Sequence, residues 1–512
     1  MVQVIPIDFR GARAVAGPLT LGQLNVAKWL ADAPHAPAAR LEQHLPVPPG
    51  TTVDAVAAAL GALVSRHEGL RSRYTLGDPG EQRVLDSGSV PLDVYDELPA
   101  ELGGVSAGAP VRFVAAAADG LVTDLAAVYS HIAVDFQALM VLEREFAALL
   151  RGEPLPGVAL QPLDRAEAEC SPARRRRQEQ ALRHWFRHVE AAPAHLYAGP
   201  RADPAGGSGA CGMSSEAAAR ALDRIADRTR TSRPTIVLAA WCALLARRTG
   251  YDVCRFVMLS ANRFESALSE FVGTLAQSTF VAVDTAGAGF DELVRRAFGA
   301  VLQAGVNGAY HVYRQDAGTR ERVAARGVAP SFEPLFNSVI VDTRGFDVPE
   351  PAAPPAPTDL GWVEMPPTNI LLRFDLGRAD DAVVARVWSG DTGRVTPGEA
   401  RELLLALERL LLAAAAQDLD PAGIAAALAL PPLPRPPGWR LIDGCWVDLD
   451  EVQRLLDEAL GPGAARLSGP DLTAVVLDGS VTAEEARRRC LALLPGRHAA
   501  MVPRAFVHRA LN

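Results

Sequence analysis

The sequence is almost without lysine. Its 51 basic residues include one lysine, Lys28, in a chain of 512 residues. Any mechanism that needs a lysine ammonium group elsewhere in the chain is therefore excluded. The basic residues are also outnumbered by 60 acidic ones, which leaves a net charge of -9. A nucleic-acid partner is not expected, because proteins that bind nucleic acids usually present a basic face.

Paired cysteines and long apolar runs are missing as well. No CxxC pair and no Cys/His cluster at metal-ligand spacing occurs, so neither disulfides nor a metal site is expected. The segment "MVQVIPIDFRGARAV" has no apolar signal core, and no charge-free apolar run approaches the ~20 residues of a membrane helix. We expect a cytoplasmic protein without a membrane partner. The six cysteines are scattered over positions 170, 211, 242, 254, 445 and 490.

The residues that are present have the patterning of a mixed α/β chain. Apolar residues recur at helical spacing in four segments, which predicts helices over 52–70, 136–152, 233–250 and 397–417. Between them stand short runs typical of strands, among them "LVTDLAAVYSHI", "VCRFVMLS", "FNSVIVDT" and "AVVARVWSG".

Glycine and proline mark the expected loops and one boundary. The glycine-rich residues 200–212 and the Pro/Ala-rich residues 351–359 are expected to be loops. Residues 428–438, "LALPPLPRPPG", are stiff and proline-dense, as an interdomain linker would be. The residues after this segment should therefore form a separate small unit.

The stretch "YSHIAVDFQAL", residues 129–139, holds a histidine four residues before an aspartate. We expect a strand that runs to about Ser130, a tight connection, and a helix that begins near Asp135. Aspartate suits a helix start, where it accepts hydrogen bonds from free amides. Histidine at a strand end is well placed for proton transfer at neutral pH. The spacing alone leaves open whether His131 is catalytic or a satisfied histidine.

Other segments decide how this stretch is interpreted. "SHIAVDF" matches the HHxxxDG motif of nonribosomal peptide synthetase condensation domains at His131 and Asp135, and six further segments resemble motifs of that family in the family's order. The resemblance covers roughly residues 1 to 420. The six segments are "PLTLGQLNVAKWL" (18–30), "RHEGLRSRY" (66–74), "YDVCRFVMLSANR" (251–263), "FVGTLAQSTFVAVD" (271–284), "PLFNSVIVDTR" (334–344) and "ILLRFDL" (370–376).

This resemblance implies an α/β fold of two lobes similar to chloramphenicol acetyltransferase, in a V arrangement with a tunnel between them. The expected domains are an N-terminal lobe over residues 1–175, a C-terminal lobe over 176–425, the linker over 426–438, and a small α+β subdomain over 439–512.

The resemblance also implies a mechanism. Peptidyl or acyl carrier proteins present the substrates on phosphopantetheine arms, and no cofactor is bound directly. A carrier-bound acyl or aminoacyl group passes to an amine or hydroxyl acceptor without an acyl-enzyme, so a GxSxG nucleophile is not needed. His131 would be catalytic, and Asp135 would pair with Arg263 to support it. The expected tunnel residues are Ser130, Phe136, Gly273, Gln277 and Ser278.

The sequence departs from the family pattern at four of these positions. Ser130 stands where the family has its first histidine, Phe136 replaces a glycine, and Gln277 and Ser278 replace asparagine and threonine. Many transferases of the wider superfamily keep only HxxxD, so Ser130 is compatible with catalysis, whereas the ring of Phe136 could narrow the tunnel. Two functions stay open: a condensation enzyme, and a catalytically inactive platform that recruits carrier proteins or tailoring enzymes. The retention of His131 favours the enzyme.

The C-terminal residues 439–512 look like the small C-terminal subdomain of adenylation enzymes. The most specific part of this resemblance is "LPGRHAAMVPRAFV", residues 494–507. In that family a lysine after this segment contacts the acyl phosphate, but this sequence has no lysine beyond Lys28 and no counterpart of the ATP-binding subdomain. Adenylation by this chain is not expected, and the segment is interpreted as a relic or as a docking and stabilising module.

Overall fold

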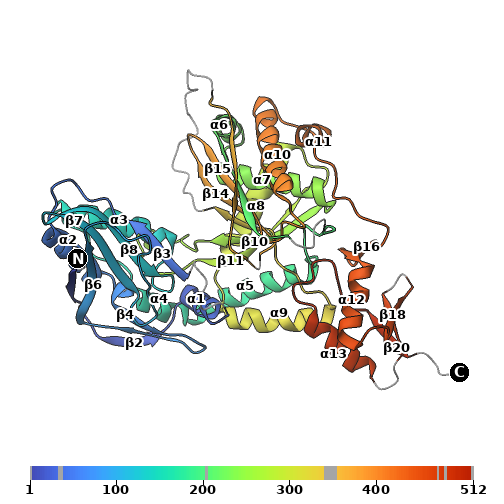
Figure 1. The fold of residues 1–512 in the computed structure, drawn as a ribbon, viewed down its shortest axis with the longest axis horizontal. Coiled ribbons are helices and arrows are strands. Elements are labelled where there is room, and N and C mark those ends of the chain that lie inside the picture. The colour runs from blue at the N-terminus through green and yellow to red at the C-terminus, as the bar shows by residue number, and fades with distance from the viewer. Residues whose placement is uncertain are drawn as a thin grey trace. The chain divides into compact units, whose positions relative to one another are not determined.

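The computed structural model describes residues 3–32, 39–201, 206–338, 355–368, 370–469, 472–477 and 481–508. The chain divides into two compact units (Figure 1). The first comprises Met1–Leu182 together with two later segments, Ser260–Gln277 and Asn307–Asp316. The second comprises Arg183–Leu259, Ser278–Val306 and Ala317–Asn512. Two segments from the second half of the sequence therefore belong to the first unit.

The first unit is built on a five-stranded sheet. Its strands pair antiparallel except for β6 and β7, which are parallel. The order is β1 (Gln3–Arg10), β6 (Ser87–Tyr95), β7 (Val111–Ala118), β8 (Leu121–Ser130) and β3 (Arg40–His44). A small second sheet has the order β2 (Val15–Pro18), β5 (Glu81–Val84), β4 (Ser72–Thr75).

Amphipathic helices close the core of the first unit. In α2 (Val53–Arg66), Thr52 caps the first turn by accepting a hydrogen bond from the amide of Ala55, and the residues that face the core recur every three to four positions. Both α2 and α3 contribute to one apolar cluster with the sheet, which also includes Val272 and Val312 from the two later segments. The other helices are α1 (Leu21–Asp32), α3 (Phe136–Leu150) and α4 (Pro162–Glu169), with 3-10 turns at Glu68–Arg71 and Ser266–Leu268.

The second unit contains a seven-stranded mixed sheet. Neighbouring strands are parallel from β10 to β14 and antiparallel from β14 to β13. The order is β11 (Gln277–Asp284), β10 (Val253–Ser260), β12 (Leu335–Ser338), β14 (Leu372–Ala379), β15 (Val383–Ser389), β9 (Gly209–Ser215) and β13 (Asp359–Glu364).

Helices cover one face of this sheet (Figure 1). Apolar residues of β14 and β15 that point to this face, such as Phe374 and Val387, form a single core cluster with the helices. The alternate residues, such as Asp375 and Arg386, point to the opposite face. The helices are α6 (Glu216–Thr229), α7 (Arg233–Thr249), α8 (Phe290–Val306), α10 (Pro397–Ala416) and α11 (Pro421–Leu428), while α5 (Pro172–Ala191) and α9 (Val312–Arg326) contain boundaries between the units.

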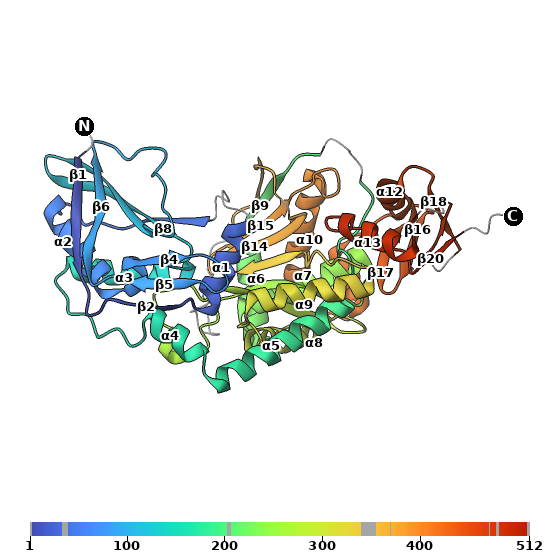
Figure 2. The same cartoon turned by 90° about the horizontal axis from the view of Figure 1, so that it is seen from below.

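The C-terminal part of the second unit is a small α+β arrangement (Figure 2). Its core joins α12 and α13 with the short strands, and it also takes in Ala194 and Val328 from the rest of the unit. These residues therefore share an apolar cluster with the rest of the second unit. The elements are β16 (Trp439–Ile442), β17 (Cys445–Asp448), α12 (Leu449–Leu460), β18 (Ala465–Ser468), β19 (Thr473–Val476), α13 (Ala483–Leu493) and β20 (Ala505–His508).

The four helices expected from apolar spacing are confirmed as α2, α3, α7 and α10. The expected loop over 200–212 is wrong at its end, because β9 begins at Gly209 and is held between two antiparallel neighbours. Of the expected loop over 351–359, residues 351–354 lie outside the described residues, and Asp359 begins β13. Within the described ranges, no helix has both the length and the apolar character needed to cross a membrane.

Candidate active site

His131 is the first residue of the tight turn between β8 and α3. Both backbone polar groups of His131 are hydrogen-bonded. The amide of His131 donates to the carbonyl of Ala39 at 2.9 Å, and its carbonyl accepts a hydrogen bond from the Thr274 hydroxyl. One residue earlier, the Ser130 amide donates to the carbonyl of Pro110 at 2.8 Å. The backbone that presents the imidazole is therefore fixed by the sheet and by the 260–277 segment.

The imidazole of His131 packs edge-on against an aromatic ring. Its ring centroid lies 6.1 Å from that of Trp29 on α1, with an interplanar angle of 87°. The Nδ1 atom is enclosed and has no hydrogen-bond partner among the described residues. A substrate can therefore meet this ring only through Nε2. Because no carboxylate holds Nδ1, packing and the backbone anchors set the orientation of the ring.

Asp135 is the N-cap of α3, and its carboxylate is fully engaged. Oδ1 accepts hydrogen bonds from the Ala138 amide at 3.0 Å and from the Arg263 guanidinium at 2.6 Å, and Oδ2 accepts one from the Leu275 amide at 3.0 Å. The side chain is 3% exposed. Asp135 thus ends the His131 turn, starts the helix and ties both to the 260–277 segment, and its burial keeps the carboxylate away from solvent.

Arg263 is the partner of Asp135 in a buried ion pair. Besides Asp135, its guanidinium donates to a set of three backbone carbonyls, and its side chain is 7% exposed. The planar, forked donors of arginine suit such a multiple contact better than a lysine ammonium would. The carbonyls are those of Leu268 at 2.9 Å, Phe271 at 2.6 Å and Gly273 at 3.1 Å. The pair predicted from the resemblance is present, and it organises the whole 263–275 loop.

The same loop packs closely on α1. A Cβ atom at Gly22 would lie 2.3 Å from the carbonyl oxygen of Thr274 and 2.6 Å from the Cα atom of Leu275, so only glycine allows this approach. Thr20 strengthens the contact, because its hydroxyl donates to the Thr274 carbonyl at 3.3 Å. The helix that carries Trp29 and the loop that braces Asp135 are thereby joined directly, around His131.

The remaining residues predicted for the tunnel have different surroundings. Ser130 is buried at the end of β8, whereas Phe136 is 44% exposed on the first turn of α3. Gly273 lies against the Phe271 ring, which a Cβ atom would meet at 2.5 Å, and Gln277 is buried.

The side-chain amide of Gln277 is hydrogen-bonded to the backbone. Its Nε2 donates to the Tyr310 carbonyl at 2.9 Å, and its Oε1 accepts from the Tyr310 amide at 3.4 Å. These bonds give Gln277 a structural partner, and contact with a substrate would require them to break. Ser278 follows Gln277 in β11, is half-buried, and belongs to the second unit.

Tyr129 stands next to the turn but is not suited to acid-base chemistry near neutral pH. Tyr129 precedes Ser130, and its hydroxyl is buried without a partner among the described residues. Burial raises the pKa of Tyr129, so the phenol stays neutral at physiological pH. Across the described residues, no group of three or more His, Cys, Asp or Glu side chains is arranged to hold a metal ion. Among the described residues 129–135, His131 carries the side chain best suited to proton transfer near neutral pH.

Three contacts of this site were not predicted from the sequence. They are the Trp29 ring against His131, the Thr274 hydroxyl on the His131 carbonyl, and the Leu275 amide on Asp135. Trp29 lies within the first of the six motif segments, residues 18–30, but nothing in the sequence indicates its contact with His131. The roles of Thr274 and Leu275 depend on a loop far away in sequence, and no local pattern indicates them.

Comparison with known proteins gives matches in structure only. No protein-family model matches the sequence, and no curated protein does. A structure of the SgcC5 protein from Streptomyces globisporus is 20% identical with a TM-score of 0.56, covering 78% of this chain and 99% of that chain. A structure concerned with condensation domain-mediated chain release from the enacyloxin polyketide synthase is 22% identical with a TM-score of 0.56, covering 79% and 85%.

A third similar structure is the X-domain of teicoplanin biosynthesis in complex with OxyB. It is 21% identical with a TM-score of 0.57 and covers 81% of this chain and 96% of that chain. The chain has the condensation-domain fold. At these identities the likeness establishes the fold alone, and it confirms the α/β class and the resemblance that the order of motifs predicted. In the condensation-domain fold of this chain, His131 and the Asp135–Arg263 pair lie together in the first unit.

Proposed function

We propose that the chain is a condensation enzyme of natural-product biosynthesis. It transfers an acyl or aminoacyl group from the phosphopantetheine thiol of a carrier protein to an amine or hydroxyl acceptor, and forms an amide or an ester. The substrates arrive on peptidyl or acyl carrier proteins or, for the acceptor, as a free small molecule. The enzyme binds no cofactor of its own, does not adenylate its substrates, and works in the cytoplasm.

His131 is the catalytic residue of this proposal. Its Nε2 accepts the proton of the attacking amine or hydroxyl as the nucleophile adds to the thioester carbonyl. The tetrahedral intermediate then collapses, the C–S bond breaks, and the phosphopantetheine sulfur leaves as a thiol after taking up a proton. A hydrogen bond from the protonated ring to the intermediate would stabilise the charge that develops there. No acyl-enzyme forms, so the step needs no nucleophilic serine or cysteine.

The observation that carries this proposal is the fixed position of His131. Its backbone amide and carbonyl are held by Ala39 and Thr274. Asp135 fixes the end of the same turn through Arg263 and Leu275. Holding a proton acceptor in one orientation lowers the entropic cost of the transition state. A surface that only recruits partners gains nothing from a histidine placed in this way.

In this proposal Ser130 and Phe136 affect which substrates are accepted, and they do not take part in proton transfer. Ser130 is buried and leaves His131 as the single histidine of the turn. Phe136 is 44% exposed, so its ring is available to contact a bound molecule. We propose that these two residues select an unusual donor or acceptor.

A recruitment platform is the second candidate. It is favoured by the similarity to an X-domain that was solved together with OxyB, and by Ser130 in place of the first histidine of the family motif. In this alternative the chain binds carrier proteins or a tailoring enzyme and performs no transfer.

Intact mass spectrometry of carrier proteins distinguishes the two candidates. Carriers loaded by neighbouring pathway enzymes are incubated with candidate amine and hydroxyl acceptors, with and without this protein. Loss of the acyl group from the donor carrier, matched by the same mass gain on an acceptor only when the protein is present, is the expected result. Carriers that bind the protein but keep their acyl group with every acceptor would contradict the enzyme and support the platform.

A further inference from the structure

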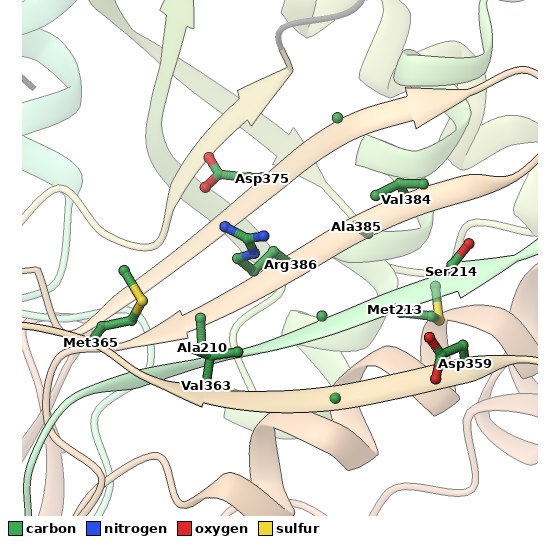
Figure 3. A pocket seen from close by; sticks show the side chains of 13 residues that line it. Ala210, Met213, Ser214, Asp359, Val363, Met365, Asp375, Val384, Ala385 and Arg386 are labelled. Atoms are coloured by element: carbon green, nitrogen blue, oxygen red, sulfur yellow. The ribbon is translucent and has the colours of Figure 1, made fainter. Parts of the chain in front are cut away.

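The face of the large sheet opposite its core helices carries a trough (Figure 3). It runs along β9, between the side chains of β13 on one side and those of β15 on the other. The strand register determines which residues lie side by side in the trough: Gly212 of β9 stands between Gly361 of β13 and Arg386 of β15. The trough encloses about 500 Å³, and all of its lining residues belong to the second unit.

The floor of the trough is made of very small residues. Ala210, Gly212 and Ser214 alternate along β9, and Gly361 lies beside Gly212. Sterics do not require either glycine. A Cβ atom on Gly212 would meet only the Gly361 carbonyl oxygen, at 4.0 Å, one on Gly361 would meet nothing within 4 Å, and neither glycine has a positive φ.

Glycine inside a strand carries a cost in stability and often marks a place where a ligand or another backbone approaches closely. Gly212 and Gly361 are neighbours on adjacent strands, and space is open above both of them. This arrangement therefore indicates a ligand that lies close to the backbone of the sheet. At ~3.3 Å per residue, the floor from Ala210 to Ser214 is about 13 Å long, which suits an elongated molecule.

The walls are apolar at one end. Val363 is 61% exposed beside Ala210, and Met365 continues the same wall, while Val384 stands on the opposite wall beside Ser214, at the far end of the floor. Such side chains favour a hydrocarbon chain, because burying them against it removes apolar surface from water. Asp359 stands at the other end and would repel an anion there.

One cation, Arg386, projects into the trough without an ion pair to any described residue. Arg386 stands opposite Asp375 in the register, but the Asp375 carboxylate accepts its hydrogen bond from Arg373 at 2.8 Å. The Arg386 guanidinium instead lies 5.4 Å from the centre of the Trp388 ring, and it forms no ion pair within the described residues. A forked guanidinium of this kind is suited to bind a carboxylate through two hydrogen bonds.

We propose that this trough binds an elongated, apolar small molecule that carries one carboxylate. The carboxylate lies on Arg386, and the chain runs over Gly212 and Gly361 toward Val363 and Met365. The proposal does not rest on the proposed transfer reaction, because it uses no residue of the His131 turn.

Calorimetric titration of the full chain with octanoate tests the proposal, with octan-1-ol as the uncharged probe. We expect saturable binding of octanoate, and weaker binding of octan-1-ol. Gly212→Val and Gly361→Val fill the floor and should each weaken octanoate binding at least tenfold. Arg386→Gln should reduce the affinity for octanoate to that for octan-1-ol, while the matched control Arg378→Gln, on the neighbouring strand and outside the trough, should leave it unchanged.

Melting temperatures show whether the variants fold. Valine suits a strand and meets open space at both positions, so neither glycine substitution should lower the melting temperature. Absence of saturable octanoate binding to the wild type overturns the proposal, as does unchanged binding by the valine variants. Equal affinities for octanoate and octan-1-ol in the wild type would overturn the role of Arg386.

Discussion

Substitution of Arg263 by alanine measures how strongly the His131 turn is held in place. The change leaves the Asp135 carboxylate buried without its counter-charge and deprives three carbonyls of their donor. Removal of one partner of a buried ion pair typically costs about 3–5 kcal/mol. For a unit of roughly 200 residues, where 1 kcal/mol corresponds to about 2–4 °C, we expect the first unit to melt about 6–20 °C lower.

The assay is differential scanning calorimetry of the full chain, combined with hydrogen exchange of the 260–277 segment. Arg144→Ala is the matched control, because Arg144 on α3 pairs with Glu270 of the same segment but both side chains are exposed. Exposed pairs contribute about 0–1 kcal/mol, so this control should shift the melting temperature by at most about 4 °C. Equal shifts for Arg263→Ala and Arg144→Ala would refute the reasoning that a buried ion pair holds the turn.

Three further substitutions test the surroundings of a histidine and of two glycines. Burial, with the nearby charge of His195, lowers the pKa of His498 to about 3, below its unfolded value near 6.5. Between these two pKa values the unfolded chain binds more protons than the folded one, so the contribution of His498 to stability is highest above pH 6.5 and falls toward pH 3 by about 1.4 kcal/mol per pH unit. Urea unfolding at pH 7 and at pH 5 gives the loss of unfolding free energy between the two pH values, and this loss should be about 2 kcal/mol smaller for His498→Gln than for the wild type. An unchanged loss would contradict the assignment. Gly22→Ala places a Cβ atom against the Thr274 carbonyl and should destabilise the first unit by about 1–3 kcal/mol. The control Gly299→Ala, in open space on α8, should stabilise its helix by up to about 1 kcal/mol. Melting temperatures that rise for both variants would contradict the close approach of α1 to the loop.

The part of the fold that depends on local pattern could be predicted from the sequence. Apolar spacing predicted the helix that became α3, and the aspartate before it predicted that the helix begins where it does, because capping is decided by a few neighbouring residues. The order of motifs predicted the condensation-domain fold. It also suggested Arg263 as the partner of Asp135.

The rest could not be predicted, because it depends on contacts between distant segments. Nothing in the composition of residues 260–277 indicates that they leave their neighbours in sequence and join the first unit. The hydrogen bonds from Thr274 and Leu275 follow from that placement alone. Gly212 was assigned to a loop by its glycine-rich surroundings, but pairing with strands on both sides makes it part of β9.

The central claim is that His131 accepts the proton of the attacking nucleophile, and the single-turnover rate of acyl transfer tests it most directly. The measurement compares the wild type with His131→Gln, which keeps a hydrogen-bonding side chain of similar reach but accepts no proton at physiological pH. Equal melting temperatures for the two proteins would show that the turn is intact. We predict that His131→Gln slows transfer by about 100-fold or more, and transfer at the rate of the wild type would contradict the claim.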